Sequence, residues 1–241
     1  MTEAWLRIER LNAYRGHLHI LHDVSIDVRG EPLAIIGRNG MGKTTLCESI
    51  MGLLRRNLSG SIEFMEHEVL GQPSYRIVAA GLGYVPQGRR LFPSLSVDEH
   101  LAIAERRQPG NAGWSRARIY DLFPALADKK KRAAGRLSGG EQQMLSISRA
   151  LMNNPKMLVM DEPSEGLAPI MVNRMIDAMK PLVETGVGLF LVEQNLWVAT
   201  ELARRQAIMV NGVIVREVSA DELRRDPELQ QRYLGARGTS E

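Results

Sequence analysis

The stretch Gly37-Arg-Asn-Gly-Met-Gly-Lys-Thr44 decides the fold of this chain. Its glycines, lysine and threonine have the spacing GxxxxGK[ST] of a phosphate-binding loop. The apolar run Leu33–Ile36 precedes it and residues 45–51 have helical character, so the sequence predicts the strand, loop and helix that the motif requires. Glycine-rich turns also join strands to helices for packing reasons alone. A match at every fixed position favours the phosphate site.

The residue types in this loop suit the triphosphate of a nucleotide. The glycines let the backbone turn tightly, so that successive N–H groups point at phosphate oxygens. Lys43 adds a positive charge toward the β- and γ-phosphates, and Thr44 offers a hydroxyl to Mg²⁺. We therefore expect ATP and Mg²⁺ as cofactors. The predicted phosphate-loop contacts are Gly37, Arg38, Asn39, Gly40, Met41, Gly42, Lys43, Thr44 and Thr45.

A second apolar run, Met157-Leu-Val-Met-Asp-Glu162, ends in two acidic residues. This pattern is typical of a buried parallel strand that delivers carboxylates at its C-terminal end. We predict that Asp161 holds the metal and that Glu162 is the general base for the attacking water. An acidic turn before Pro163 without chemistry is the alternative, and the phosphate loop makes it the weaker one.

The segment Leu137-Ser-Gly-Gly-Glu-Gln-Gln143 first predicts the start of a helix. Ser138 followed three residues later by Glu141 is a capping box. Apolar positions then recur at helical spacing until Asn154-Pro155. Two consecutive glycines are costly in chain entropy at a helix start, which indicates close approach by another group. A phosphate at this N-terminus fits that requirement.

This last segment closely resembles the signature of the ATP-binding cassette (ABC) ATPases, and further landmarks follow in order over about residues 6–235. The resemblance implies that Tyr14 stacks on adenine, that Gln87 senses the γ-phosphate through the metal, and that Gln194 occupies the usual place of a switch histidine. It also implies two cassettes arranged head to tail around ATP. The signature residues expected at that nucleotide are Leu137, Ser138, Gly139, Gly140 and Glu141. Without the resemblance, Tyr14 is an ordinary strand aromatic and Gln87 a surface loop residue.

Two departures from the general ABC pattern narrow the resemblance. Ala168 stands where most cassettes carry an aspartate at the dimer interface, and Gln194 replaces histidine. Glutamine donates a hydrogen bond but does not exchange a proton near neutral pH, which leaves Glu162 as the sole candidate base. Together with Val85-Pro-Gln-Gly-Arg89 and Arg232-Tyr-Leu-Gly235, these positions resemble the smaller ATPase subunit of branched-chain amino-acid importers. Urea and amide importer ATPases share the same segments.

This resemblance implies several partners and a location. They are a homologous ABC ATPase, two integral membrane permease subunits and, indirectly, a solute-binding protein that recognises the cargo. The chain would act peripherally at the cytoplasmic face of the inner membrane. No run approaches the roughly 20 apolar residues of a membrane span, and residues 1–4 do not begin a signal sequence, so we expect no direct membrane insertion.

Composition is consistent with a compact intracellular ATPase. Apolar residues make up 44% of 241 residues, enough for a substantial core. The net charge of +3 is too small to indicate nucleic acid as a partner. Arg89-Arg90 and the run at residues 129–132 are predicted to be solvated, with contact to anionic lipid headgroups or to a partner subunit as the alternatives. The single Cys47 is expected to be buried, and the five histidines lack metal-binding spacing.

The expected fold is an α/β P-loop NTPase in one ABC ATPase domain, residues 1–241. Apolar strands that alternate with helices predict a central, mostly parallel sheet. Residues 5–29 and 61–70 predict a small antiparallel sheet, and residues 206–218 a hairpin turning at Asn211-Gly212. Residues of about 88–150 predict a helical subdomain docked on the RecA-like core, with helices after Ser96 and near residues 116–123. Pro169 predicts the first turn of another helix.

A soluble ABC ATPase acting on ribosomes or DNA is the main rival function. Ribosome-acting relatives usually carry two cassettes, and DNA-repair relatives insert long coiled coils between the phosphate loop and the signature. This chain has one cassette, and about fifty residues separate Gln87 from Leu137. A nucleotide-dependent kinase would leave the signature without a purpose. The sequence therefore favours a transporter ATPase.

Overall fold

The computed structural model of the 241-residue chain describes residues 5–105 and 113–234. The expectations about residues 1–4 and about Gly235 lie outside this part. Within the described ranges, no helix combines the length and the apolar character that crossing a membrane requires.

A six-stranded sheet forms the centre of the molecule, with the strand order β10-β9-β3-β8-β7-β6. Its strands β6, β7, β8, β3 and β9 pair in parallel, and β10 is the antiparallel edge strand. The bounds are β3 Leu33–Ile36, β6 Leu82–Val85, β7 Met157–Asp161, β8 Gly188–Glu193, β9 Arg205–Val210 and β10 Val213–Ser219. The predicted mostly parallel sheet is confirmed, but the pairing of β9 with β3 was not anticipated.

This central sheet separates two hydrophobic cores. Successive side chains of a strand point to opposite faces, and β3 shows the consequence. Leu33 and Ile35 belong to the core shared with the antiparallel sheet. Ala34 and Ile36 belong to the core shared with the helices beyond the opposite face. Burial on both faces explains why these strands are continuous apolar runs rather than alternating ones.

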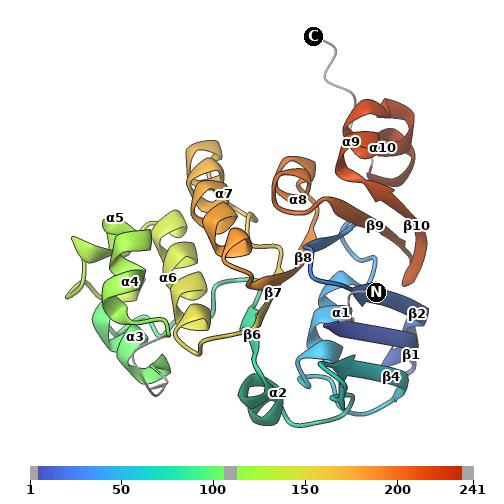
Figure 1. Cartoon of the computed structure of the whole chain (residues 1–241), viewed down its shortest axis with the longest axis horizontal. Coiled ribbons are helices and arrows are strands. Elements are labelled where there is room, and N and C mark those ends of the chain that lie inside the picture. The colour runs from blue at the N-terminus through green and yellow to red at the C-terminus, as the bar shows by residue number, and fades with distance from the viewer. Residues whose placement is uncertain (1–4, 106–112, 235–241) are drawn as a thin grey trace.

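A four-stranded antiparallel sheet lies beside the central sheet, in the order β2-β1-β4-β5. Its bounds are β1 Leu6–Arg15, β2 Leu18–Val28, β4 Leu58–Phe64 and β5 His67–Glu68, which confirms the prediction. Helix α1, Lys43–Ile50, contacts β2 on one side and β7 and β8 on the other (Figure 1). The helix that follows the phosphate loop is therefore packed between the two sheets.

Several helices gather at the end of the molecule away from the antiparallel sheet (Figure 1). They are α3 Val97–Ala104, α4 Arg116–Leu122, α5 Pro124–Ala127, a 3₁₀ turn at Ala134–Arg136, and α6 Gly139–Leu151. The predicted capping boxes are present in full at Ser96 and Ser138. All of these helices fall within the range expected for a helical subdomain.

The remaining helices pack around the central sheet. They are α2 Ser74–Ala80, α7 Pro169–Glu184, α8 Leu196–Leu202, α9 Ala220–Arg225 and α10 Pro227–Leu234. As predicted, Pro169 is in the first turn of α7, where its missing N–H leaves no helical bond unmade. The face of α7 that bears Val172, Met175 and Met179 is buried.

The turn between β9 and β10 joins three parts of the fold. Asn211 and Gly212 both have positive φ, 47° and 77°, as the predicted type I′ turn requires. The carbonyl of Gly212 accepts a hydrogen bond from the His22 N–H in β2, 2.9 Å away. The Gly212 N–H donates to the Met41 carbonyl in the phosphate loop, also 2.9 Å away. The turn thus ties the central sheet to the antiparallel sheet and to the phosphate loop.

This packing predicts a larger loss of stability for Gly212→Ala than for Gly16→Ala. Both glycines have positive φ, but a Cβ atom at 212 would lie 1.9 Å from the Ile20 carbonyl oxygen, whereas one at 16 meets nothing within 4 Å. Backbone strain alone should cost Gly16→Ala about 1 kcal/mol, and the added overlap should bring Gly212→Ala to about 2 to 4 kcal/mol. Urea unfolding measures both, and equal losses would contradict the close contact.

Candidate functional site

Lys43 is the most enclosed charged group of the predicted phosphate loop. Its residue is 3% exposed, and Gly42 before it has a φ of 100° that only glycine adopts without strain. The ammonium Nζ donates to the carbonyls of Gly37 and Arg38 at 2.8 and 3.0 Å. It also forms an ion pair with Oε1 of Glu162 at 2.9 Å. All three N–H donors of the lysine therefore have acceptors within the protein.

Glu162 reaches Lys43 because of the strand order. It follows β7, which is separated from β3 by β8 alone, and parallel strands end at the same edge of the sheet. Its backbone N–H donates to the Val192 carbonyl of β8 at 2.9 Å, and its φ is 46°. The Glu162 side chain is 8% exposed, so the ion pair is almost fully buried.

Thr44 and Asp161 form a second pair beside the first. The Thr44 hydroxyl Oγ1 donates to Asp161 Oδ1 at 3.2 Å. Asp161 is completely buried, and burial raises the pKa of its carboxyl to about 6 although the hydrogen bond from Thr44 opposes this. Its second oxygen, Oδ2, has no hydrogen-bond partner among the described residues. A hydroxyl beside a carboxylate with one buried oxygen that lacks a partner is a donor set that suits Mg²⁺.

Glu193 is a buried acidic residue that the sequence analysis overlooked. It ends β8, is 1% exposed, and accepts a hydrogen bond from the Ser164 N–H at 3.0 Å. Its other oxygen accepts from the N–H groups of Gln194 and Asn195, both at 3.1 Å. Burial raises the pKa of Glu193 to about 6 because desolvation outweighs these hydrogen bonds. One carboxylate thus holds together the loop after Glu162 and the loop that carries Gln194.

Gln87 and Gln194 belong to the same neighbourhood through these loops. The Gln87 amide Nε2 donates to Oε2 of Glu165 at 2.9 Å, three residues after Glu162. Gln194 is exposed, and its backbone N–H is the one held by Glu193. The structure therefore brings both predicted glutamines to the carboxyl edge of the sheet. The only sequence signal for Glu193 was its position as an acidic residue at the end of an apolar strand.

Tyr14 lies at the end of a row of three rings. The residue is 37% exposed, and its ring stacks on His19 with centroids 4.1 Å apart and planes 10° from parallel. His19 in turn contacts His22 with centroids 3.9 Å apart. The row lies on β1 and β2, and His22 is bonded to the Gly212 turn that also holds the phosphate loop.

The outer part of the phosphate loop is open to solvent. Arg38, Asn39 and Gly40 are exposed. Met41 is held by the Gly212 turn, and the Thr45 hydroxyl accepts a hydrogen bond from Arg15 Nε at 3.1 Å. The middle of the loop is thus exposed, while contacts with the Gly212 turn and with Arg15 hold the residues that follow it.

The predicted signature residues lie at the start of α6. Ser138 and Glu141 complete the capping box, and Glu141 also contacts Lys129. The Leu137 side chain is buried in the helical core, so its backbone alone lies at the helix start. Among the described residues, no hydrogen bond or ion pair joins residues 137–141 to residues 37–45, and Figure 1 places α6 in a different part of the fold from α1.

The basic runs differ in part from the prediction, whereas the cysteine agrees with it. Arg89 and Lys129 are partly buried, against the prediction, whereas Arg90, Lys130, Lys131 and Arg132 are exposed. Cys47 is fully buried in α1, as predicted, and burial raises the pKa of its thiol well above the usual value. In the parts of the chain that the structure describes, no group of three His, Cys, Asp or Glu side chains is arranged to bind a metal.

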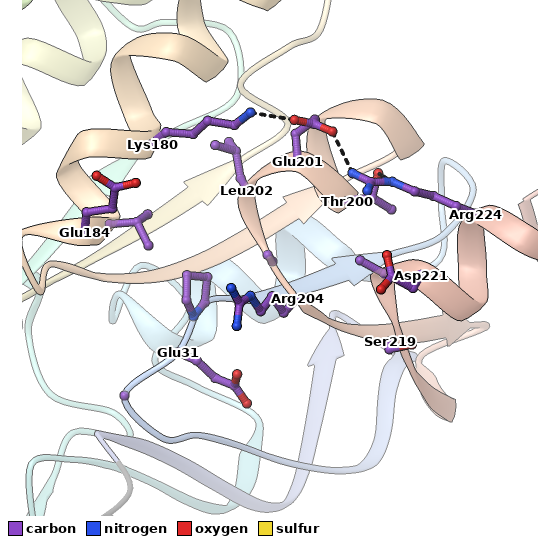
Figure 2. A pocket seen from close by; sticks show the side chains of 15 residues that line it. Glu31, Lys180, Glu184, Thr200, Glu201, Leu202, Arg204, Ser219, Asp221 and Arg224 are labelled. Carbon is purple, nitrogen blue, oxygen red and sulfur yellow. Dashed lines mark hydrogen bonds and ion pairs between the residues drawn. The ribbon is translucent and has the colours of Figure 1, made fainter.

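A surface cavity of about 780 Å³ lies elsewhere on the molecule (Figure 2). Figure 2 shows the ion pairs of Glu201 with Lys180 and Arg224 along its wall, 2.6 and 2.7 Å long. Gly30 and Arg204 line it and precede β3 and β9, so it lies at the amino ends of these parallel strands. Ligands of such sheets bind at the carboxyl ends, and none of the predicted site residues lines this cavity.

Residues 21–165, more than half of the chain, match the family model described as ABC transporter. The chain belongs to the ABC transporter family. It is an ATP-binding subunit of the ATP-hydrolysing kind, as predicted. BraG of Pseudomonas aeruginosa, a high-affinity branched-chain amino acid transport ATP-binding protein, is 40% identical over 95% of this chain and 99% of its own length. LivF of Archaeoglobus fulgidus, a probable branched-chain amino acid transport ATP-binding protein, is 34% identical over 95% and 98%.

Solved structures agree with this family and fold. The ADP conformation of the ABC transporter cassette MJ1267 superposes with a TM-score of 0.82 at 28% identity, covering 98% of this chain and 100% of that one. A nucleotide-free cassette of an ABC transporter gives 0.81 at 29%, covering 94% and 97%. The predicted P-loop NTPase fold is therefore confirmed.

The buried contacts of Glu193 predict that Glu193→Gln destabilises this ABC ATPase. The amide keeps the size of the carboxylate but turns an N–H₂ donor toward backbone N–H donors, so at least one buried donor loses its acceptor. We expect the free energy of unfolding to fall by about 1 to 3 kcal/mol in urea titrations at pH 7. The control is Glu165→Gln, which makes the same chemical change at an exposed position. Similar stability of both variants would contradict the holding role of Glu193.

Proposed function

We propose that this ABC ATPase powers the import of branched-chain or other hydrophobic amino acids. The observation that carries the proposal is the likeness to BraG over nearly the whole of both chains. The glutamine at 194 and the alanine at 168 support it, because the resemblance to the smaller importer ATPase rests partly on them. Ala168 stands at the N-cap of α7 and makes no side-chain cap, which an aspartate there would provide.

In this proposal, the phosphate loop binds the phosphates of ATP and Tyr14 stacks on the adenine. The exposed residues 38–40 would lie beside the phosphates. Thr44, Asp161 and Gln87 would hold Mg²⁺, which suits the unpartnered Oδ2 of Asp161. When bound, Mg²⁺ supplies positive charge that neutralises the β- and γ-phosphate oxygens.

The ion pair between Lys43 and Glu162 gives the proposal an order of events. Lys43 has no spare N–H donor, so it binds phosphate only by giving up one of its present acceptors. Exchange of Glu162 for the γ-phosphate leaves the carboxylate free to accept a proton from water. The water oxygen then bonds to the γ-phosphorus, and the bond between this phosphorus and the ADP oxygen breaks. Gln194 donates a hydrogen bond to the γ-phosphate but accepts no proton.

The separation of the signature from the phosphate loop supports a site shared by two subunits. Because no hydrogen bond or ion pair among the described residues joins residues 137–141 to residues 37–45, we propose that the signature acts on ATP held by a homologous ABC ATPase placed head to tail. Two permease subunits would dock on the helical side, where Phe92 and Ile103 are 55% and 61% exposed. A solute-binding protein would select the cargo, and the ATPase would lie peripherally at the cytoplasmic face of the membrane.

Replacement of Glu162 tests the hydrolytic part. Glu162→Gln should lower kcat by about 100-fold or more because the general base is lost. Its ATP affinity should rise, since ATP no longer displaces Lys43 from a carboxylate. Lys43→Ala should instead weaken ATP binding. Steady-state ATPase assays and equilibrium dialysis measure these two quantities.

The matched control is Glu184→Gln, at an exposed position of α7, which should leave both quantities unchanged. Normal turnover of Glu162→Gln would remove Glu162 from the proposed role. A lower ATP affinity of this variant would contradict the exchange at Lys43.

Capture of the complex tests the transport part. Tagged protein recovered from solubilised native membranes should bring down two polytopic membrane proteins and a second ATPase, identified by mass spectrometry. The matching solute-binding protein should then bind leucine, isoleucine or valine. Binding of urea or short-chain amides instead would assign the alternative importer that shares these sequence segments. Ribosomal or DNA-repair proteins without membrane subunits would overturn the transport proposal and leave the ATPase intact.

A further inference from the structure

Three consecutive residues directly after Gln87 have a left-handed backbone. Gly88, Arg89 and Arg90 have φ angles of 77°, 65° and 42°. Glycine adopts this region freely, whereas each arginine adopts it at a cost. Strain of this kind next to a reactive site persists only where surrounding contacts enforce it, and it indicates a functional position.

The enforcing contacts come from one face of α6. The Arg89 carbonyl accepts a hydrogen bond from the Ser146 hydroxyl at 3.2 Å. The Arg90 carbonyl accepts one from Arg149 Nη1 at 2.9 Å. Ser146 and Arg149 are three residues apart and therefore lie on the same side of the helix. This segment is thus bonded along α6, whose first turn is the signature.

The left-handed backbone at residues 88–90 directs the Arg89 guanidinium toward Gly139 of the signature. A Cβ atom on Gly139 would lie 3.1 Å from Nη2 and 3.2 Å from Nη1 of Arg89. A Cβ atom on Gly166, in the loop after Glu162, would lie 3.7 Å from Nη2. The guanidinium is therefore packed against the signature and beside the loop that Glu193 holds.

Contacts with the described residues use little of the hydrogen-bonding capacity of Arg89. Nη1 donates to Gln142 Oε1 at 3.3 Å, a long hydrogen bond. None of the ion pairs among the described residues includes Arg89, and the side chain is partly exposed. A guanidinium has five N–H donors in a planar arrangement that suits phosphate oxygens. A guanidinium that has no acidic partner among the described residues, and that lies directly against Gly139 of the signature, is suited to contact a phosphate.

We infer that Arg89 is a nucleotide-binding residue of the signature side, which contacts the triphosphate held by the phosphate loop of the opposing ATPase. This inference rests on the proposed two-subunit site. Arg89 adds the positive charge that Ser138 and the two glycines lack. The same segment begins at Gln87, so the residue that faces the metal in one site is linked through two peptide units to a cation that faces the phosphates of the other.

Four variants test the inference in a Glu162→Gln background, where bound ATP is not consumed. Arg89→Ala removes the charge and the hydrogen bond, Arg89→Lys keeps the charge, and Arg89→Gln keeps a donor for Gln142 without the charge. Arg90→Ala is the matched control. The Arg90 side chain is exposed, and the hydrogen bond from Arg149 to the Arg90 carbonyl does not depend on that side chain. Each is measured for ATP affinity of the single chain and for ATP-driven association with the ATPase subunit that copurifies with it.

We expect the Arg89 variants to change ATP-driven association and to leave the ATP affinity of the single chain unchanged. Arg89→Ala and Arg89→Gln should need at least about tenfold more ATP for association, because a charge-assisted contact is lost. Arg89→Lys should recover part of this loss, and ATP affinity of the single chain should not change in any variant. Association as tight in Arg89→Ala as in the parent overturns the inference, and so does full recovery by Arg89→Gln, which would show a purely structural role. Absence of ATP-driven association in the parent itself overturns the two-subunit site, and the inference with it.

Discussion

A nearly buried ammonium ion requires an acceptor for each of its three N–H donors, and much of this structure serves to supply them at Lys43. Two acceptors are carbonyls of the phosphate loop itself, which must therefore curl around the lysine. The third is the Glu162 carboxylate, which is within reach because β8 alone separates β7 from β3. Their neighbours in sequence, Thr44 and Asp161, form a second contact beside this one. The need to satisfy Lys43 therefore links the strand order, the shape of the loop and the pairing of residues 43 and 44 with residues 162 and 161.

Local rules explain which parts of the fold the sequence predicts correctly. The phosphate loop, the capping boxes at Ser96 and Ser138, and the Asn211-Gly212 turn each depend on a few neighbouring residues. The two acids at the end of β7 were also predictable, because an apolar strand buried on both faces carries polar residues only where it ends.

The parts that sequence reasoning missed depend on contacts between distant segments. Strand β9 pairs in parallel with β3, although the two strands are far apart in the chain. The sequence of neither strand indicates which strand it pairs with. Glu193 ends an apolar strand as Asp161 does, but its function follows from backbone N–H groups that converge from two loops. Arg89 was expected in solvent because a basic dipeptide usually is, and only the left-handed backbone after Gln87 turns it against Gly139.

The buried position of Cys47 has a practical consequence for work on this ATPase. Its side chain is fully enclosed in α1, and burial together with the nearby Asp161 carboxylate raises the pKa of the thiol. Reagents such as maleimides attack exposed thiolates, so the folded chain offers them no accessible target of its own. Thiol-directed spectroscopic labels can therefore be used on the folded chain without first replacing its own cysteine. A spin or fluorescence probe attached through one introduced surface cysteine will report on a single chosen place, without first altering the core beneath the phosphate loop.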